Sequence, residues 1–188
     1  MKGGMRFGEG TMTWEGGYSF TGTFEYNAAY GMGHMVTQKG TYTGRFANNM
    51  HLGVGTFVDS EGQGKYEGEW VHDLQQGPGK ESWSCNSHFD GQYFKGKKNG
   101  SGKMVWSDGS IYEGEYQDDR QTGLGCFKFL SGTKYFGYFV DGDMSGFGHY
   151  MQADKSYHGM FDQDKKNGHG QVHYKDGRKF IGTFVNGK

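Results

Sequence analysis

The sequence predicts an all-β protein, an elongated single-layer meander of antiparallel β-hairpin repeats that is twisted along its length. Two observations carry this prediction. The pattern aromatic-x-Gly-x-aromatic recurs eight times at intervals of 22 to 24 residues, and a Gly-x-Gly pair recurs in step with it. Short fixed periods are typical of repeat architectures, in which each unit packs on its neighbours. Residues 1–188 are therefore expected to form one array of about eight repeats.

The first strand of each repeat follows from the period of two in the aromatic motif. In Tyr112-Glu113-Gly114-Glu115-Tyr116 the two rings and the glycine share one face, and both glutamates share the other. The same positions recur along the array, so their rings should line one continuous groove. In the six central repeats the groove aromatics are Tyr42, Phe46, Tyr66, Trp70, Phe89, Tyr93, Tyr112, Tyr116, Tyr135, Phe139, Tyr157 and Phe161.

The second strand begins after Gly-x-Gly, where apolar alternation resumes, as at Phe127 and Phe129. Asp108-Gly109 follows the preceding copy of this strand, and Asp-Gly between alternating segments favours a tight two-residue turn. Residues 117–122, between the two strands of one repeat, are expected to form a longer loop. Right-handed twist should curl the sheet around its rings. At roughly 10 Å for each pair of strands, eight repeats would extend over roughly 80 Å.

Composition agrees with a folded chain and narrows its surroundings. Only 33% of residues are hydrophobic, but 17% are aromatic, and disordered chains are poor in aromatics. The net charge of −1 offers no reason to expect nucleic acid as a partner. The N-terminus lacks the apolar stretch of a secretory signal, and two cysteines do not make a disulfide framework. We therefore expect an intracellular, cytoplasmic protein in a reducing compartment.

Catalytic and cofactor chemistry finds no support in the sequence. Gly-x-Gly occurs eight times between strands, whereas a dinucleotide site uses one such loop to open a helix. Motifs of metalloproteases and nucleophile elbows are absent. Cys85, His88 and Cys126 occupy different phases of the repeat, and His51 and His72 are expected in loops. The sequence thus predicts a non-enzymatic protein without a cofactor or a metal site in one chain, although a metal site shared between chains stays open.

Three stretches carry a resemblance to a known family. "FDGQYFKGKKNGSG" (89–102), "YEGEYQDDRQTGLG" (112–125) and "YHGMFDQDKKNGHG" (157–170) resemble the MORN repeat (membrane occupation and recognition nexus), and the resemblance extends over nearly the whole chain. The family often has histidine directly before Gly-x-Gly. In this chain that site instead holds Tyr30, Leu52, Gln76, Asn99, Thr122, Ser145 and Asn167. Any role of the family's histidine therefore does not carry over to this protein.

The resemblance implies a scaffold or protein-interaction module in cytoskeletal or membrane-associated structures, such as cortical and basal complexes and ciliary radial spokes. MORN arrays also accompany lipid kinases and methyltransferases, so a regulatory segment of an enzyme is another hypothesis. A third is recruitment to phosphoinositide membranes, which requires clustered basic residues. The candidate lipid-binding residues are Lys95, Lys97, Lys98 and Lys103, an isolated basic island.

The last repeats depart from the others on the face opposite the groove. Where earlier repeats place glutamate, these have apolar or aromatic residues and histidine, which suggests an interface. The candidate interface residues are Phe136, Tyr138, His158, Met160 and Ile181. We expect homodimerisation or docking of a protein partner there. Both ends of the chain stop at nearly the same phase of the repeat, which suggests a fragment of a longer array.

Overall fold

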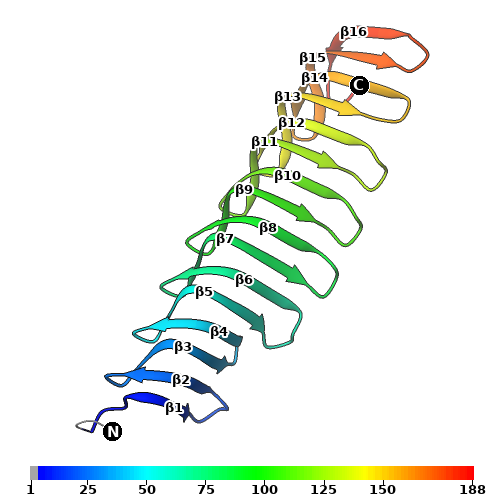
Figure 1. The fold of residues 1–188 in the computed structure, drawn as a ribbon. Helices are drawn as coiled ribbons and strands as arrows, with labels where there is room; N and C mark the ends of the chain where they lie inside the picture. The colour runs from blue at the N-terminus through cyan, green and yellow to red at the C-terminus, as the bar shows by residue number, and fades with distance from the viewer. Residues whose placement is uncertain (1–3) are drawn as a thin grey trace. The chain divides into compact units, whose positions relative to one another are not determined.

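The computed structural model describes residues 4–188, in which every regular element is a β-strand (Figure 1). The chain divides into two compact units, the first ending at Lys97 and the second covering Lys98–Lys188. The strands assigned to the first unit are β1 (Gly8–Thr13), β2 (Ser19–Glu25), β3 (Ala28–Thr37), β4 (Gly40–Ala47), β5 (Met50–Asp59), β6 (Gly64–Val71), β7 (Leu74–Trp83) and β8 (His88–Phe94). Those of the second, which takes all of β9 except Lys97, are β9 (Lys97–Val105), β10 (Ile111–Gln117), β11 (Arg120–Lys128), β12 (Lys134–Val140), β13 (Asp143–Met151), β14 (Lys155–Asp162), β15 (Lys165–Tyr174) and β16 (Lys179–Phe184).

Within each unit every strand pairs antiparallel with the next strand in the chain, so the predicted meander of hairpins is confirmed. The glycines of the two motifs lie opposite one another; Gly114, for example, pairs with Gly102 on one side and Gly125 on the other. Gly-x-Gly is therefore inside a strand, not in a loop before it. For the same reason His51, which the sequence placed in a loop, lies in β5.

The two kinds of turn are the reverse of the prediction. The segment 117–122 is not a long loop: Gln117 pairs with Arg120 across a two-residue turn, in which Asp118 and Asp119 both have positive φ, 49° and 71°. Both residues in the left-handed region make a type I′ turn, and aspartate tolerates that region better than most residues do. At Asp108-Gly109 the turn is instead wider. The amide of Trp106 donates to the Ser110 carbonyl, and Gly109, at φ 85°, donates to Trp106.

An aromatic ring lies across facing pairs of glycines, that of tyrosine in most repeats and that of Phe20 over Gly22 and Gly33. A Cβ added to Gly114 or to Gly125 would come within 2.5 and 2.6 Å of the Tyr112 ring or its hydroxyl. The Tyr112 hydroxyl donates to the Glu115 carbonyl at 2.9 Å, next to the bulge between β10 and β11. The same bond, to the carbonyl three residues on, is made by Tyr42, Tyr66, Tyr135 and Tyr157. Glycine is thus required on both strands because the ring occupies the space of their side chains.

The hydroxyl of Tyr112 is expected to contribute measurably to stability. Replacing Tyr112 by Phe keeps the ring and removes the donor to the Glu115 carbonyl. The loss should be about 1 kcal/mol in the free energy of unfolding, measured by urea denaturation. The control is Tyr26→Phe, since Tyr26 is 72% exposed. Equal stabilities of the two variants would contradict this account of the tyrosine.

The first glycine of each Gly-x-Gly has a different role. Gly123 has φ 58° and lies at the bulge, where the register between β10 and β11 shifts after Gly114. A residue without Cβ adopts this left-handed conformation without steric cost. The bulge also bends the strand next to the tyrosine. In this Gly-x-Gly the first glycine therefore allows the bend, and the second leaves space for the tyrosine ring.

Successive type I′ turns are connected by a ladder of hydrogen bonds. In the second unit the amide of Asp119 donates to the Lys98 carbonyl at 3.0 Å, and the Asp119 carboxylate accepts from the Lys98 amide at 2.8 Å. Asn49, Asp73 and Asp164 make the same pair of bonds one repeat back, to Ala29, His51 and Met144. Each second turn residue therefore holds its repeat at a fixed distance from the previous one.

Removing one such side chain should weaken the contact between two successive repeats. Asp119→Gly keeps the left-handed turn but removes the acceptor of the Lys98 amide. We expect a loss of about 1 kcal/mol in the free energy of unfolding and faster amide hydrogen exchange at Lys98. Gly142 occupies the matching turn position naturally, with only the backbone bond to Gln121. Unchanged exchange at Lys98 would show that the carboxylate does not hold the repeat.

The core of each unit is a file of aromatic rings on one face, which we call the ring face. The first ring of a repeat meets the second ring of its own repeat and that of the next, edge to face. Tyr112 lies 5.3 Å from Tyr116 and 5.0 Å from Phe139, measured between ring centroids. Edge-to-face contacts at this spacing are favourable beyond the area they bury. All twelve groove aromatics are buried, so most of their surface is used in packing on one another.

Candidate interaction surfaces

The face opposite the rings, the outer face, carries an apolar patch in the second unit. Six side chains that are 42% to 70% exposed make up this outer patch: Leu124, Phe136, Tyr138, Phe147, Met160 and Ile181. Register pairs four of them, because Leu124 lies opposite Tyr138 and Phe147 lies opposite Met160, while Ile181 lies opposite Gln171 at the edge of the patch. Between them, His149 is the partner of both Phe136 and His158. Exposed apolar groups in such continuity are unusual on a free surface.

Four of the five candidate interface residues belong to this patch, and the fifth, His158, adjoins it. Sequence reasoning missed Leu124, Phe147 and His149. The first two are the middle residues of Gly123-Leu124-Gly125 and Gly146-Phe147-Gly148. Since Gly-x-Gly is inside a strand, its middle residue points to the outer face. The sequence places both residues at outward positions, but they can be recognised as such only if the strand is known to include the two glycines.

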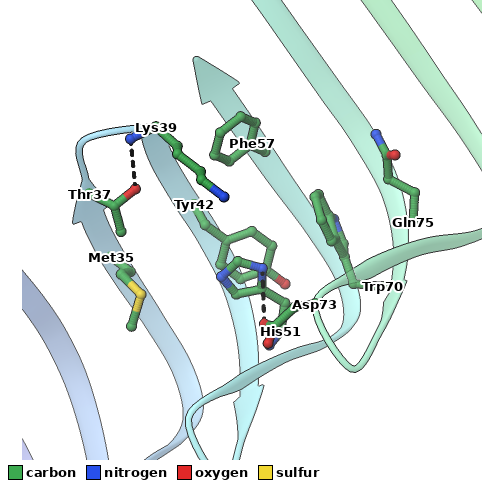
Figure 2. A pocket seen from close by; sticks show the side chains of 9 residues that line it. All are labelled: Met35, Thr37, Lys39, Tyr42, His51, Phe57, Trp70, Asp73 and Gln75. Carbon is green, nitrogen blue, oxygen red and sulfur yellow. Dashed lines mark hydrogen bonds and ion pairs between the residues drawn. The ribbon is translucent and has the colours of Figure 1, made fainter. Parts of the chain in front are cut away.

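The ring face of the first unit has a hollow, shown in Figure 2. The hollow has a volume of about 380 Å³, with Tyr42, Trp70 and Phe57 among its walls. His51 stacks on Tyr42, with ring centroids 3.7 Å apart and planes 15° from parallel. Because Tyr42 and Trp70 are almost fully buried, mainly Phe57 and polar groups at the rim are left to meet another molecule.

His51 and Asp73 form the polar side of this hollow. The Asp73 carboxylate accepts from the His51 amide at 2.7 Å and lies 3.4 Å from its Nδ1, without hydrogen-bond geometry at that nitrogen. Burial lowers the pKa of His51, and the negative charge of Asp73 opposes this shift. Burial and the charge of Asp73 raise the pKa of Tyr42 to about 12. Both rings are thus held neutral at physiological pH.

Further aromatic rings lie on the ring face of the second unit. Trp106 stacks on Phe127 at 5.3 Å between centroids, and Phe127 lies 4.5 Å from Phe129. These three rings are half-buried, in contrast to the first-position tyrosines. The accessible aromatic surface of this face therefore comes from the return strands and not from the aromatic-x-Gly-x-aromatic positions. Whether the groove aromatics contact a partner stays a prediction.

The family of the chain follows from its sequence pattern together with this repeat geometry. The family model of the MORN repeat matches residues 1–17, 42–64, 66–84, 89–111, 112–134, 135–156 and 157–177, which is more than half of the chain. The chain belongs to the MORN-repeat family. Residues 18–41 lie outside the matches of this MORN-repeat protein, and there Phe20 replaces the tyrosine. Strands β2 and β3 nevertheless pair as in the other repeats.

Solved structures with some likeness to this MORN-repeat protein include two domains of the TCP type. The SAS-4 (dCPAP) TCP domain of Drosophila melanogaster, solved with a proline-rich motif of Ana2 (dSTIL), is 11% identical with a TM-score of 0.41, over 80% of this chain and 89% of that one. The TCP10 domain of Danio rerio CPAP is 10% identical with a TM-score of 0.49, over 90% and 80%. At these scores the likeness carries no argument about function. No curated protein sequence matches the chain.

The candidate lipid-binding lysines are divided between the two units. In the first, the Lys95 ammonium lies 5.1 Å from the ring centroid of Phe94. In the second, the Lys103 ammonium lies 3.8 Å from the Glu113 carboxylate, which offsets part of its charge. Phosphoinositide binding by Lys95, Lys97, Lys98 and Lys103 stays a prediction.

Over residues 4–188 there is no group of three metal-ligating side chains and no helix able to span a bilayer.

Proposed function

We propose that this MORN-repeat protein is a non-enzymatic scaffold whose copies associate through the outer patch of the second unit. The observation that carries the proposal is the continuity of six exposed apolar side chains over β11 to β16. The proposed setting is a cytoskeletal or membrane-associated assembly, as the family suggests. The occupant of the patch is a second copy of this chain.

The charges around the patch favour a second copy. None of the cross-strand pairs that build the patch contains a carboxylate or an ammonium group: Leu124 faces Tyr138, Phe136 faces His149, and Phe147 faces Met160. A two-fold axis would bring these neutral groups against their own counterparts, without like charges meeting. Two outer faces would then pack as the sheets of a β-sandwich do, about 10 Å apart.

The size of the patch is also appropriate for self-association. A large aromatic side chain buries about 150–250 Å² when fully covered, so six half-exposed apolar groups leave roughly 600 Å² to bury. A stable interface buries about 800 Å² on each partner, part of it in a polar rim. The neighbouring polar residues of β13 to β15 provide that rim.

The proposal is tested by measuring the molar mass of the protein in solution. Light scattering at protein concentrations from about 1 to 100 µM should show a dimer at neutral pH, in a range where interfaces of this size associate. A monomer at every concentration would contradict the proposal. Substitutions in the patch, described in the Discussion, then show whether this face is the one that associates.

A further inference from the structure

Two histidines stack on each other on the outer face of the second unit. His149 of β13 and His158 of β14 are cross-strand partners, with ring centroids 3.7 Å apart and planes 21° from parallel. His173 of β15 lies edge-on to His158 at 5.8 Å. On its other side His149 faces Phe136, a central residue of the outer patch. The pair is therefore covered if a second copy covers the patch.

The groups around the pair are mostly basic or neutral. Phe136 of β12 faces His149, and Gln171 of β15 faces His158, so neither cross-strand neighbour carries a charge. The same unit also has a hollow of about 460 Å³ that is lined by both His149 and His173. The charged or titratable groups near the pair or around the hollow are Lys134, Lys155, Lys175, Lys179, His169, Tyr174 and Asp154, and farther along the outer face of β13 to β15 lie Asp143, Asp162 and Lys165. Asp154 is the carboxylate that lines the hollow, and Asp162 is paired with Lys165 across β14 and β15.

A proton on either ring is therefore unfavourable. Burial lowers the pKa of His149, and the charge of His158 lowers it further; burial and His173 do the same for His158. Nε2 of His149 is buried and makes no hydrogen bond with any described residue, so an added proton there has no acceptor. A second copy packed over the patch removes more water from both rings, which penalises the charged form again.

We propose that the stacked pair His149 and His158 makes self-association sensitive to pH: the copies associate while both rings are neutral and separate when the rings take up protons. This inference rests on the proposed self-association through the outer patch. The sign follows from the lowered pKa values. Both rings are neutral above the ordinary value of 6.5, and association is lost as the pH falls through the lowered values of the free chain.

The size of the effect follows from proton linkage. Each proton that binds the free chain but not the associated one weakens association by about 10-fold per pH unit, and a dimer holds two copies of the pair. Sedimentation should therefore give a dissociation constant that is higher at pH 5.5 than at pH 7.5 and that rises by about 10-fold per pH unit and proton once the pH is below the pKa values of the free chain. Circular dichroism at both pH values checks that the separated chain is still folded.

Two variants show whether the pair is responsible. In His149→Gln/His158→Gln the ratio of the dissociation constants at pH 5.5 and 7.5 should fall to near one, whatever the affinity at pH 7.5. The control is His88→Gln, which removes an exposed histidine of β8 and should keep the ratio of the natural protein. A double variant that keeps the natural ratio overturns the inference.

The remaining outcomes separate the inference from the proposed function. A natural protein that is dimeric at pH 7.5 and equally so at pH 5.5 overturns the inference and leaves the scaffold function standing. A monomer at pH 7.5 overturns both. If the double variant does not associate at all, nuclear magnetic resonance titration of the natural protein decides: both imidazole pKa values should be lower in the concentrated dimer than after dilution to monomer, and equal values overturn the inference.

Discussion

Replacing Phe136 and Tyr138 together by glutamate is expected to convert the associated protein into a folded monomer. Both side chains point outward from β12, and they are 55% and 50% exposed, so the single chain should fold without them. In the dimer each substitution would bury a carboxylate on both copies, and at position 138 the cross-strand neighbours, Leu124 and Ser145, carry no positive charge. An uncompensated buried charge costs several kcal/mol, so we expect the dissociation constant to rise by at least about 100-fold.

A matched control exists on the outer face of the first unit. Met32 is 61% exposed and faces Arg45 across the β3–β4 pair, so Met32→Glu adds a carboxylate outside the patch, opposite a cation. This variant should keep the mass of the natural protein. Light scattering reports the mass of each variant, and urea denaturation confirms folding. If Phe136→Glu/Tyr138→Glu keeps the dimer, or if Met32→Glu loses it, association does not occur through the outer patch.

Replacing Gly125 by alanine is expected to be strongly destabilising for the addition of a single methyl group. The added Cβ would lie 2.6 Å from Cε2 and from the hydroxyl oxygen of Tyr112, closer than atoms can approach. Tyr112 is fully buried between Tyr116 and Phe139 and cannot swing away. Overpacking of this kind costs about 1–3 kcal/mol or more, and the lost hydroxyl bond to Glu115 adds to it.

The array contains its own control for this substitution. Gly10 is the second glycine of the Gly8-x-Gly10 pair, and a Cβ there meets only the Phe24 ring, at 3.7 Å, which is an ordinary contact. Gly10→Ala should therefore change the free energy of unfolding by less than about 1 kcal/mol. Thermal and urea denaturation of both variants measure the difference. Similar losses at Gly10 and Gly125 would mean that the tyrosine ring does not explain the glycines.

The candidate site was predictable in part from one rule, that alternate residues of a strand share a face. That rule identified Phe136, Tyr138, Met160 and Ile181 as outward residues, and the structure places them on the exposed outer face. Leu124 and Phe147 were missed because the strands were taken to begin after Gly-x-Gly. The stack of His149 on His158 depends on cross-strand register, and no spacing along one strand contains that information.

The turns show how a local signal can mislead. Asp108-Gly109 has the composition of a tight hairpin turn, yet it lies in the wider connection, where a single left-handed residue is sufficient. Asp118-Asp119 lacks glycine and makes the tight one. Its second residue is held by hydrogen bonds to Lys98, one repeat earlier, and these bonds help to offset the cost of the left-handed conformation.

By itself, the sequence determined the repeat, the antiparallel hairpins and the side of each strand that carries the rings. These features depend on two periods in the sequence: the motif recurs about every 23 residues, and within the motif the rings occupy alternate positions. Tertiary structure alone decided why both strands need glycine, which turn is tight, and which outward residues meet. The physical reason is that each of these depends on atoms from neighbouring strands. Tyr112 covers a glycine of another strand, Asp119 bonds to another repeat, and His149 stacks on a partner nine residues away.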